Sequence, residues 1–550
     1  MRIPNRARAA WMLPFFILAT PMLLPLAGAD HSNSGKADTL SDSPRAAGII
    51  NRIIAGEKLY AAKLKQYSPR IETYVQYYQT DDVLSEVPSK DAYFLGRLTV
   101  AADAKEVSFI QDSIFDRLRR RPTLFSERLP LNEFAVEPLV VDRQNFDRDH
   151  YVFEPISEEY LGEVHCLAID VHPRRHTNDR DFEGRIWVED HDYAIVRLNG
   201  RRLNPPHGKL SVDFDCWREN LRPGVWLPVY IFSHESDRGD RRSFNAETRL
   251  WGYNITPWHP QKPPASPDAV SNTHRIKHVP SMSPDETERR LDLAAEHNVL
   301  KRLERAGLIA PPGPVDQVLE TVVSNLIITN HLDNLPPIQC RVLLTSTLES
   351  FSLPFTIVLS RGLIDVLPDE TSLAMILAHE LAHINSPHSL DPRYALGDGM
   401  DVPDEKLLAS MDLARNGHDE AAADAMGTEF LKNSPYKDHL AQAGLFLEAA
   451  SAAARRSPHL FGPHLGNGLT EGRQIRMATL MTGAPALRPQ NVHQIAALPL
   501  GSRLQVNAWD GSIGFIKKTV PLVDPSEKMS FQVAPVFPHL RIYPQGVKIQ

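Results

Sequence analysis

The chain has 550 residues, of which 42% are hydrophobic and 23% are charged. This composition is ordinary for a globular protein, and the length is enough for two or three domains. A formal net charge of −8 and a sequence pI near 6.3 argue against a nucleic-acid-binding protein, which needs a basic surface.

The first 29 residues have the pattern of a secretory signal peptide. Arginines at positions 2, 6 and 8 precede an apolar run over residues 11–26, and Ala-Gly-Ala at 27–29 fits a cleavage site. Asp30 would then begin the mature chain, and an uncleaved membrane anchor is the alternative. No later stretch approaches the roughly 20 apolar residues of a membrane helix. We therefore expect an exported protein, periplasmic or secreted.

Residues 45–255 are predicted to form a β-rich domain. Residues 46–67 are amphipathic and predict a leading helix, whereas short runs such as 164–171 predict strands. Two further runs, 185–188 and 193–198, are joined by Glu-Asp-His-Asp and predict a hairpin. Many antiparallel strands behind one helix indicate a curved sheet that is open on one face.

This β-rich region resembles the half-barrel of lipoprotein-sorting carriers such as LolA and LolB. The resemblance implies a hydrophobic groove for a lipid, an acyl chain or an unfolded segment, and hence peripheral membrane or lipid contact. A scaffold or docking domain is the alternative.

Three cysteines occur in the chain, and two of them, Cys166 and Cys216, lie in the β-rich region. Their spacings fit neither a zinc finger nor a Cys-x-x-Cys redox motif, and the same holds for Cys340. Export would place Cys166 and Cys216 in an oxidising compartment. They are therefore either a disulfide pair or two small buried apolar side chains.

Three segments follow the β-rich domain. Residues 256–284 are rich in proline and predict a linker. Residues 285–484 predict a mainly α-helical domain with a small sheet, and residues 485–550 predict a small β-like C-terminal module. The fold class is therefore α+β. The elements expected in the helical domain are helices over 285–306, 315–330, 371–384 and 441–454, and strands over 341–345 and 355–359.

The helix over 371–384 carries His379-Glu380-x-x-His383 among apolar and small residues. Asp369 can cap its N-terminus, and the two histidines, four positions apart, share one face. Burying two imidazoles and a carboxylate is unfavourable unless they have partners. A zinc ion satisfies both rings, and Glu380 can hold the attacking water. Two surface histidines on a solvated helix are the alternative, which the apolar neighbours disfavour.

A catalytic zinc of this type needs a third protein ligand. A metzincin would supply it from a third histidine after the motif, but Ser386 and Ser389 stand at the expected positions. Glu420 and Asp424 share a face of a second helix-like, alanine-rich segment. Glu420 can reach the metal, and Asp424 can accept the free ring N–H of a ligand histidine. An exposed acidic helix edge is the alternative.

At this point the chain resembles the zinc metallopeptidases that include the CAAX prenyl endopeptidases, HtpX and BepA. The matching segments, which together span about residues 315–481, are 349–354, 357–364, the His379-Glu380-x-x-His383 helix, His388, and Glu420-x-x-x-Asp424. The chain departs from the family at Glu349-Ser350-Phe351, where members have Asn-Ala-Phe, and it lacks their internal hydrophobic spans.

The resemblance implies one zinc ion per chain, held by His379, His383 and Glu420, with Glu380 as the general base. Asp424 and His388 would support the ligands. Family members also place a histidine and an arginine after the last ligand helix. The candidates in this chain, for which a surface position is the alternative, are His459, His464, Arg473 and Arg476.

These observations predict an exported zinc metalloendopeptidase, with protein or peptide substrates and a role in envelope protein quality control. The strand over 355–359, or its neighbour, is expected to pair with an extended substrate. The alternative is a lipid- or protein-binding chaperone or assembly factor whose metallopeptidase domain is largely latent.

Overall fold

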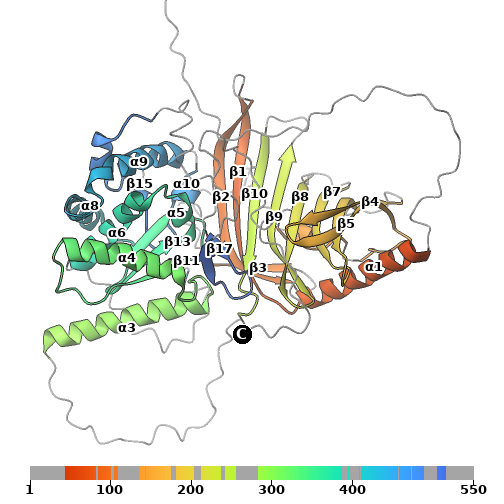
Figure 1. Ribbon diagram of the computed structural model, residues 1–550, viewed down its shortest axis with the longest axis horizontal. Helices are drawn as coiled ribbons and strands as arrows, with labels where there is room; N and C mark the ends of the chain where they lie inside the picture. The colour runs from red at the N-terminus through yellow and green to blue at the C-terminus, as the bar shows by residue number, and fades with distance from the viewer. Residues whose placement is uncertain are drawn as a thin grey trace, which may run out of the picture.

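The computed structural model describes most of the chain after residue 43 (Figure 1). The described residues are 44–81, 85–100, 104–109, 135–142, 144–174, 181–203, 212–236, 242–255, 283–386, 394–395, 408, 410–455, 457–471, 474–487 and 504–515. The predicted signal peptide, His388 and Arg473 lie outside them. Within the described ranges, no helix has the length and apolar character that crossing a bilayer requires.

The first half of the molecule is a ten-stranded antiparallel sheet in the order β3-β2-β1-β10-β9-β8-β7-β6-β5-β4. Its strands are β1 (Arg70–Asp81), β2 (Ser85–Val100), β3 (Ala104–Ser108), β4 (Tyr151–Leu161), β5 (Val164–Pro173), β6 (Phe182–Glu189), β7 (Ile195–Arg202), β8 (Asp213–Arg222), β9 (Val225–Ser236) and β10 (Arg242–Trp251). The predicted hairpin is β6–β7, and the α+β fold class is confirmed.

Helix α1 (Pro44–Leu64) covers one face of this sheet, as Figure 1 shows. Its apolar stripe enters the same core as the inward residues of the strands, because Ile53 and Ile186 are both fully buried there. Glu57 on the helix forms a buried ion pair with Arg218 on β8, at 2.7 Å. The helix therefore occupies part of the face that the sequence predicts to be an open groove.

The three cysteines are buried and free. Cys166 lies on β5 and Cys216 on β8, and strands β6 and β7 run between them. Three strand spacings amount to roughly 14 Å, whereas a disulfide needs Cα atoms within about 7 Å. The disulfide alternative is therefore wrong, and the two side chains are small buried apolar groups.

The second half is mainly helical around a four-stranded sheet in the order β11-β13-β12-β14 (Figure 1). Its elements are α3 (Pro284–Arg305), α4 (Pro314–Thr329), β11 (Gln339–Leu343), β12 (Glu349–Ser352), β13 (Thr356–Ser360), α5 (Arg361–Val366), α6 (Glu370–Asn385), α8 (Gly417–Lys432), α9 (Leu440–Ala454), α10 (Pro458–Phe461), β14 (Asn467–Gly468), β15 (Thr470–Glu471) and β16 (Gln474–Ile475).

Strand β13 is central, paired in parallel with β11 and antiparallel with β12. The expectation that residues 355–359 offer an edge to a substrate is therefore wrong for β13, because both of its edges are occupied. Its neighbour β12 differs, since β14 pairs only with Glu349 and Ser350.

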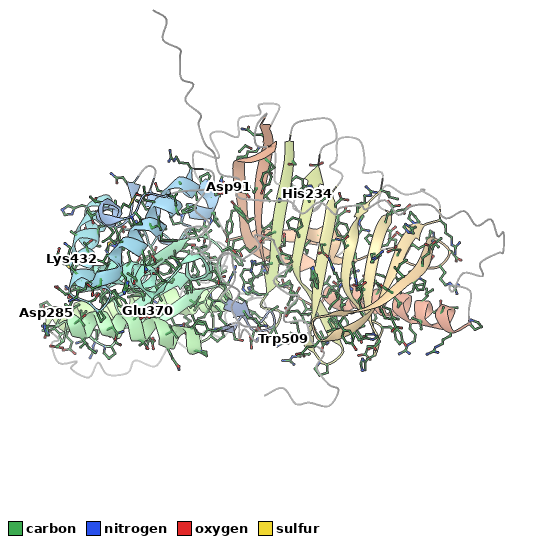
Figure 2. The ribbon with its side chains drawn as sticks, turned by 45° about the horizontal axis from the view of Figure 1, so that its top comes forward. Asp91, His234, Asp285, Glu370, Lys432 and Trp509 are labelled. Atoms are coloured by element: carbon green, nitrogen blue, oxygen red, sulfur yellow. The ribbon has the colours of Figure 1, made fainter. Side chains whose placement is uncertain are left out.

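The two halves are in direct contact. Strand β2 of the large sheet lies beside α10 (Figure 1), and its Asp91, labelled in Figure 2, accepts a hydrogen bond from the Leu460 N–H at 3.1 Å. The described part of the predicted C-terminal module is a short hairpin, β17 (Leu504–Val506) with β18 (Ile513–Phe515). The hairpin contacts both halves, because Leu504 N–H donates to Asp365 and Asn254 N–H donates to the Trp509 carbonyl.

Candidate metal centre

Helix α6 is buried on nearly all sides. The Asp369 side chain caps it by accepting the Ser372 N–H at 2.7 Å. Its apolar residues form part of the core, and His379, Glu380 and His383 are each no more than 2% exposed. The surface-histidine alternative is therefore excluded, and the cost of burying these polar groups has to be offset by partners.

Helix α8 supplies those partners because it packs very close to α6. At the crossing point stands Gly427, where a Cβ atom would lie 3.0 Å from the Ala378 carbonyl oxygen and from the His379 nitrogen. A larger residue here would have to push the backbone of α6 away by a few tenths of an ångström, so glycine favours the close crossing that brings Glu420 and Asp424 to the histidines. The Asn416 side chain caps the helix by accepting the His418 and Asp419 N–H groups.

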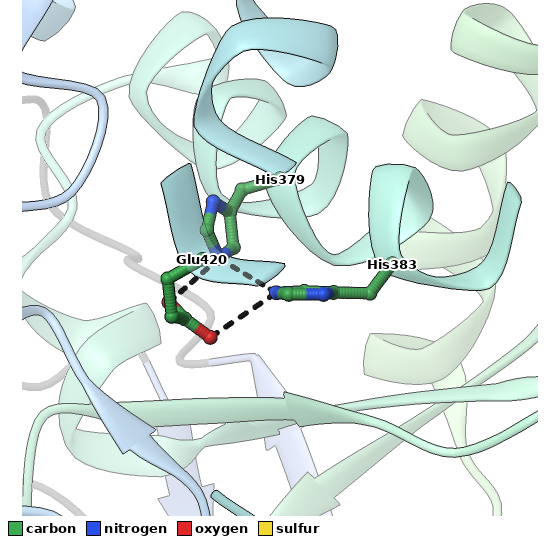
Figure 3. Close-up of side chains that lie close together, drawn as sticks. All are labelled: His379, His383 and Glu420. Atoms are coloured by element: carbon green, nitrogen blue, oxygen red, sulfur yellow. Dashed lines mark hydrogen bonds and ion pairs between the residues drawn. The ribbon is translucent and has the colours of Figure 1, made fainter. Parts of the chain in front are cut away.

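Two imidazoles and one carboxylate converge at this crossing (Figure 3). His379 Nε2 lies 3.2 Å from His383 Nε2 and 3.3 Å from Glu420 Oε2. His383 Nε2 lies 3.2 Å from Glu420 Oε1. The structure thus brings together the three predicted ligands, with their donor atoms facing one another.

Asp424 completes this arrangement from the next turn of α8. Its Oδ1 lies 2.9 Å from His379 Nδ1, so Nδ1 donates to Asp424 and Nε2 is directed at Glu420. Burial and the nearby Arg476 lower the pKa of His379. Hydrogen bonds to Asp424 and Glu420 raise it by a larger amount, so the net shift of the pKa is upward. The surroundings therefore favour positive charge at this point, and the donor set is that of a catalytic zinc site.

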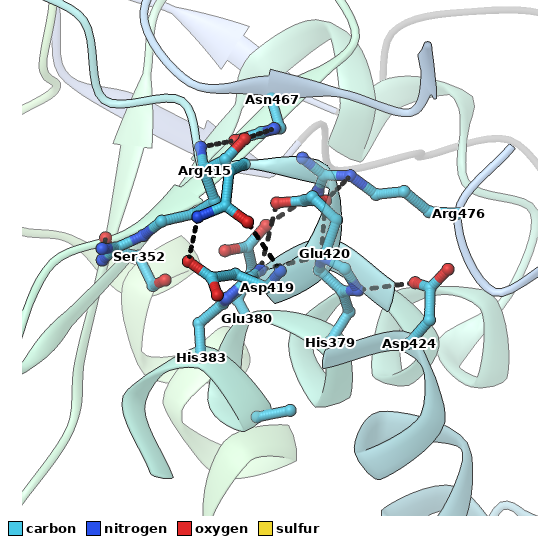
Figure 4. Close-up of polar contacts among 12 residues, drawn as sticks. Ser352, His379, Glu380, His383, Arg415, Asp419, Glu420, Asp424, Asn467 and Arg476 are labelled. Atoms are coloured by element: carbon cyan, nitrogen blue, oxygen red, sulfur yellow. Dashed lines mark hydrogen bonds and ion pairs between the residues drawn. The ribbon is translucent and has the colours of Figure 1, made fainter. Parts of the chain in front are cut away.

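Glu380 lies beside the three-residue cluster, where its carboxylate contacts β12 and Arg476 (Figure 4). Its Oε1 accepts hydrogen bonds from the Ser350 hydroxyl at 2.6 Å and from Arg476 Nη1 at 3.0 Å. Burial alone would raise the pKa of Glu380, but Arg476 and the two imidazoles outweigh burial and lower it. Glu380 is therefore an ionised carboxylate next to the cluster, as a general base must be.

Arg476 contacts the proposed base, strand β12 and one of the three proposed ligands. Besides Glu380 it contacts Ser350 Oγ at 3.1 Å, and its Nε lies 3.2 Å from Glu420 Oε2. The two imidazoles and Arg476 also hold the pKa of Glu420 well below its ordinary value, against the effect of burial. The sequence alone offers Arg476 as one of four candidate site residues after the ligand helix. It identifies Ser350 only as part of a departure from the family pattern.

The two candidate histidines do not reach the metal centre. His459 is half exposed, and its Nδ1 lies 2.8 Å from Asp91 of the large sheet. The His464 ring stacks on Tyr93, also in the large sheet, with ring centroids 4.7 Å apart. His464 is half-buried, and both histidines belong to the contact between the two halves.

A second group of possible metal ligands, Glu189, Asp190 and His191, lies at the β6–β7 turn. The Glu189 carboxylate already accepts three backbone N–H groups of that turn, from His191, Asp192 and Ala194. These hydrogen bonds explain why the Glu189 side chain is buried, and we assign no metal to this group of residues.

Two packed helices bring two imidazoles and one carboxylate together beside an ionised glutamate. This arrangement is typical of a metallopeptidase. Residues 315–397 match the model of Peptidase family M48. The resemblance seen in the sequence is thereby confirmed for this segment, which is similar to the metallopeptidases of this family. M48 peptidases are generally zinc-dependent. The matched segment includes His379, Glu380 and His383 and ends before Glu420.

Two solved structures are similar to part of the chain. A DUF1329 family protein from Desulfovibrio piger is 10% identical, with 36% of this chain and 92% of that chain covered and a TM-score of 0.18. A LolA superfamily protein from Nitrosomonas europaea is 9% identical, with 36% and 90% covered and a TM-score of 0.17. Scores this low establish no common function. A search of curated proteins gave no match.

Proposed function

We propose that this protein is an exported zinc-dependent endopeptidase with one zinc ion per chain. The convergence of His379, His383 and Glu420 donor atoms within 3.3 Å of one another carries this proposal. The three groups are buried or nearly so, and one cation between them would satisfy all three ligand atoms at once.

The residues around the cluster have distinct tasks. A bound zinc ion supplies Lewis acidity at this position. Glu380 takes a proton from the attacking water on its carboxylate and passes it to the leaving amine. Ser350 and Arg476 orient that carboxylate and keep it ionised. Asp424 fixes the tautomer of His379.

Strand β12 is the element along which an extended substrate would lie. Its Ser350 hydroxyl contacts the proposed base, so the strand runs directly past the reacting position. Among the described residues, β14 pairs with this strand only at Glu349 and Ser350, and the Ser352 carbonyl accepts a long contact of 3.4 Å from Arg415. A peptide that adds to this edge by β-augmentation would present its backbone to Glu380.

We further propose export and a role in protein quality control at the cell envelope. The signal-peptide pattern of residues 1–29 supports export. N-terminal sequencing of the mature protein should give Asp30, whereas an intact Met1 would favour a membrane anchor.

A second candidate function is a lipid- or protein-binding assembly factor with a largely latent metallopeptidase domain. The observation that favours it is the ten-stranded sheet, which contributes none of the three proposed ligands. The complete set of ligands and base favours the peptidase.

Cleavage of unfolded casein by the purified full chain separates the two. We expect cleavage that a chelator abolishes and added zinc restores, and no cleavage by Glu380→Gln. A parent protein that leaves casein intact while holding zinc would support the assembly factor and contradict the peptidase.

A further inference from the structure

A buried polar cluster joins the large sheet to the metallopeptidase half. At its centre is Glu72 on β1, which is 2% exposed. Its carboxylate accepts hydrogen bonds from the Ser346 hydroxyl at 2.7 Å, the Tyr93 hydroxyl at 2.6 Å and the Ser346 backbone N–H. Arg361, at the start of α5, approaches the same carboxylate at 3.4 Å. Two strands of one half and two segments of the other therefore meet at one carboxylate.

Each member of this cluster is held from more than one side. Arg361 is 3% exposed and donates to Ser346 Oγ at 2.6 Å. Burial raises the pKa of Tyr93 well above its ordinary value, and Glu72 raises it further. The phenol therefore stays protonated and donates to Glu72. Charge-assisted bonds of this kind are among the strong hydrogen bonds of proteins, and a lost partner is costly in a dry environment.

Strand β2 fixes a second segment of the metallopeptidase half. The Tyr93 ring stacks on His464, and the His464 and Leu465 N–H groups donate to the buried carboxylate of Glu349 at 3.0 and 3.1 Å. Asp91 accepts the backbone N–H groups at the start of α10. Residues 459–465, which lead into β14, are thus bound to the large sheet.

Both fixed segments lead directly to β12. Ser346 lies three residues before the strand begins at Glu349, and β14 pairs with the strand at Ser350. Ser350 is the residue that binds Glu380. The position of the proposed base therefore depends on β12, and the position of β12 depends on contacts with the large sheet. A displacement of about 1 Å at a catalytic group can reduce the rate by about 10²-fold.

We propose that strands β1 and β2 are part of the catalytic unit, with Glu72 and Tyr93 as positioning residues that act through β12 and Ser350 on Glu380. This inference rests on the proposed peptidase function. It assigns the ten-stranded sheet a task in the reaction, in addition to anything that the sheet binds. It also means that the metallopeptidase half is not an independent catalyst.

The first test is a pair of variants of the full chain, Tyr93→Phe and Glu72→Gln. Activity is measured with a quenched fluorescent peptide from casein that the parent cleaves. We expect kcat to fall by about 5- to 50-fold with KM within about twofold of the parent, and bound zinc to stay unchanged. Tyr60→Phe is the matched control, because it removes a buried tyrosine hydrogen bond, to the Leu139 carbonyl, that is remote from β12. The control should keep the parent kcat.

The second test is a double-mutant cycle with Ser350→Ala, which removes the link between β12 and Glu380. If Tyr93 acts through Ser350, Tyr93→Phe should cost less than about twofold in the Ser350→Ala background. Full multiplication of the two single losses would overturn the proposal. It would equally be overturned if Tyr93→Phe lowered only the melting temperature and left kcat at the level of Tyr60→Phe. Failure of the parent to cleave any peptide would instead contradict the proposed function itself.

Discussion

Replacing Glu380 and replacing Glu420 should have different effects on catalysis and on zinc binding. Glu380 binds Ser350 and Arg476 but lies outside the three-ligand cluster, whereas Glu420 presents one carboxylate oxygen to each imidazole. Glu380→Gln keeps an oxygen that can accept from Ser350 and Arg476, so the fold and the bound zinc should be retained. The lost general base should reduce kcat by about 10²- to 10⁴-fold.

Glu420→Ala removes a proposed ligand and leaves two imidazoles. Loss of a residue that merely orients a ligand already weakens metal binding by about 10- to 100-fold, so we expect a loss of at least about 100-fold in zinc affinity. Activity should return only partly at high zinc concentration. The assay is a competition titration with a chromophoric zinc chelator, run in parallel with peptide cleavage. Parent-like cleavage by Glu380→Gln would refute its role as base, and parent-like zinc affinity of Glu420→Ala would refute its role as ligand.

Three further predictions follow from other parts of the structure. Asp424→Ala should weaken zinc binding or activity by about 10- to 100-fold, because His379 loses the acceptor that orients it, and an unchanged zinc titration would contradict this. Arg218→Met leaves the Glu57 carboxylate buried and unpaired, which should cost about 3–5 kcal/mol of stability and lower the melting temperature by roughly 6–20 °C. Arg290→Met, which removes an exposed ion pair with Glu286, is the control and should leave the melting temperature unchanged. Burial raises the pKa of Cys166 and of Cys216 to about 12, so neither thiol should react with maleimide in the folded chain at neutral pH. Denaturation should make three thiols reactive. A count of one would instead support a disulfide between Cys166 and Cys216.

Local sequence patterns were sufficient to predict the helices and to name the three side chains that the structure brings together. The helix predicted over 315–330 is α4, and the one predicted over 285–306 is α3, each within one residue. The motif on α6 is informative because ligand spacing within one helix is set by the helical repeat. Glu420 and Asp424 could be named with it because they are four apart on their own helix and share a face, and the structure places both beside the histidines.

Strand order could not be read from local patterns. Alternating apolar residues identify a strand without identifying its neighbours. For this reason Cys166 and Cys216 were open to pairing until the sheet showed two strands between them. The same limit applies to β13, because its apolar run predicts a buried strand without showing whether its two edges are paired.

Contacts between distant segments were the least predictable feature. Glu72 and Ser346 are 274 positions apart, and Ser350 and Arg476 are 126 apart. Nothing in either segment alone indicates the partner. Serine at position 350 departs from the pattern of the family that the sequence resembles, and only the structure shows that its hydroxyl binds Glu380.

The measurement that tests the account most directly is the metal content of the purified full chain, determined by mass spectrometry after gel filtration in zinc-containing buffer. We predict one zinc ion per chain, absent from a folded variant in which His379 and His383 are both replaced by alanine. A parent protein that folds without zinc, or a double variant that keeps it, would contradict the assignment of this site.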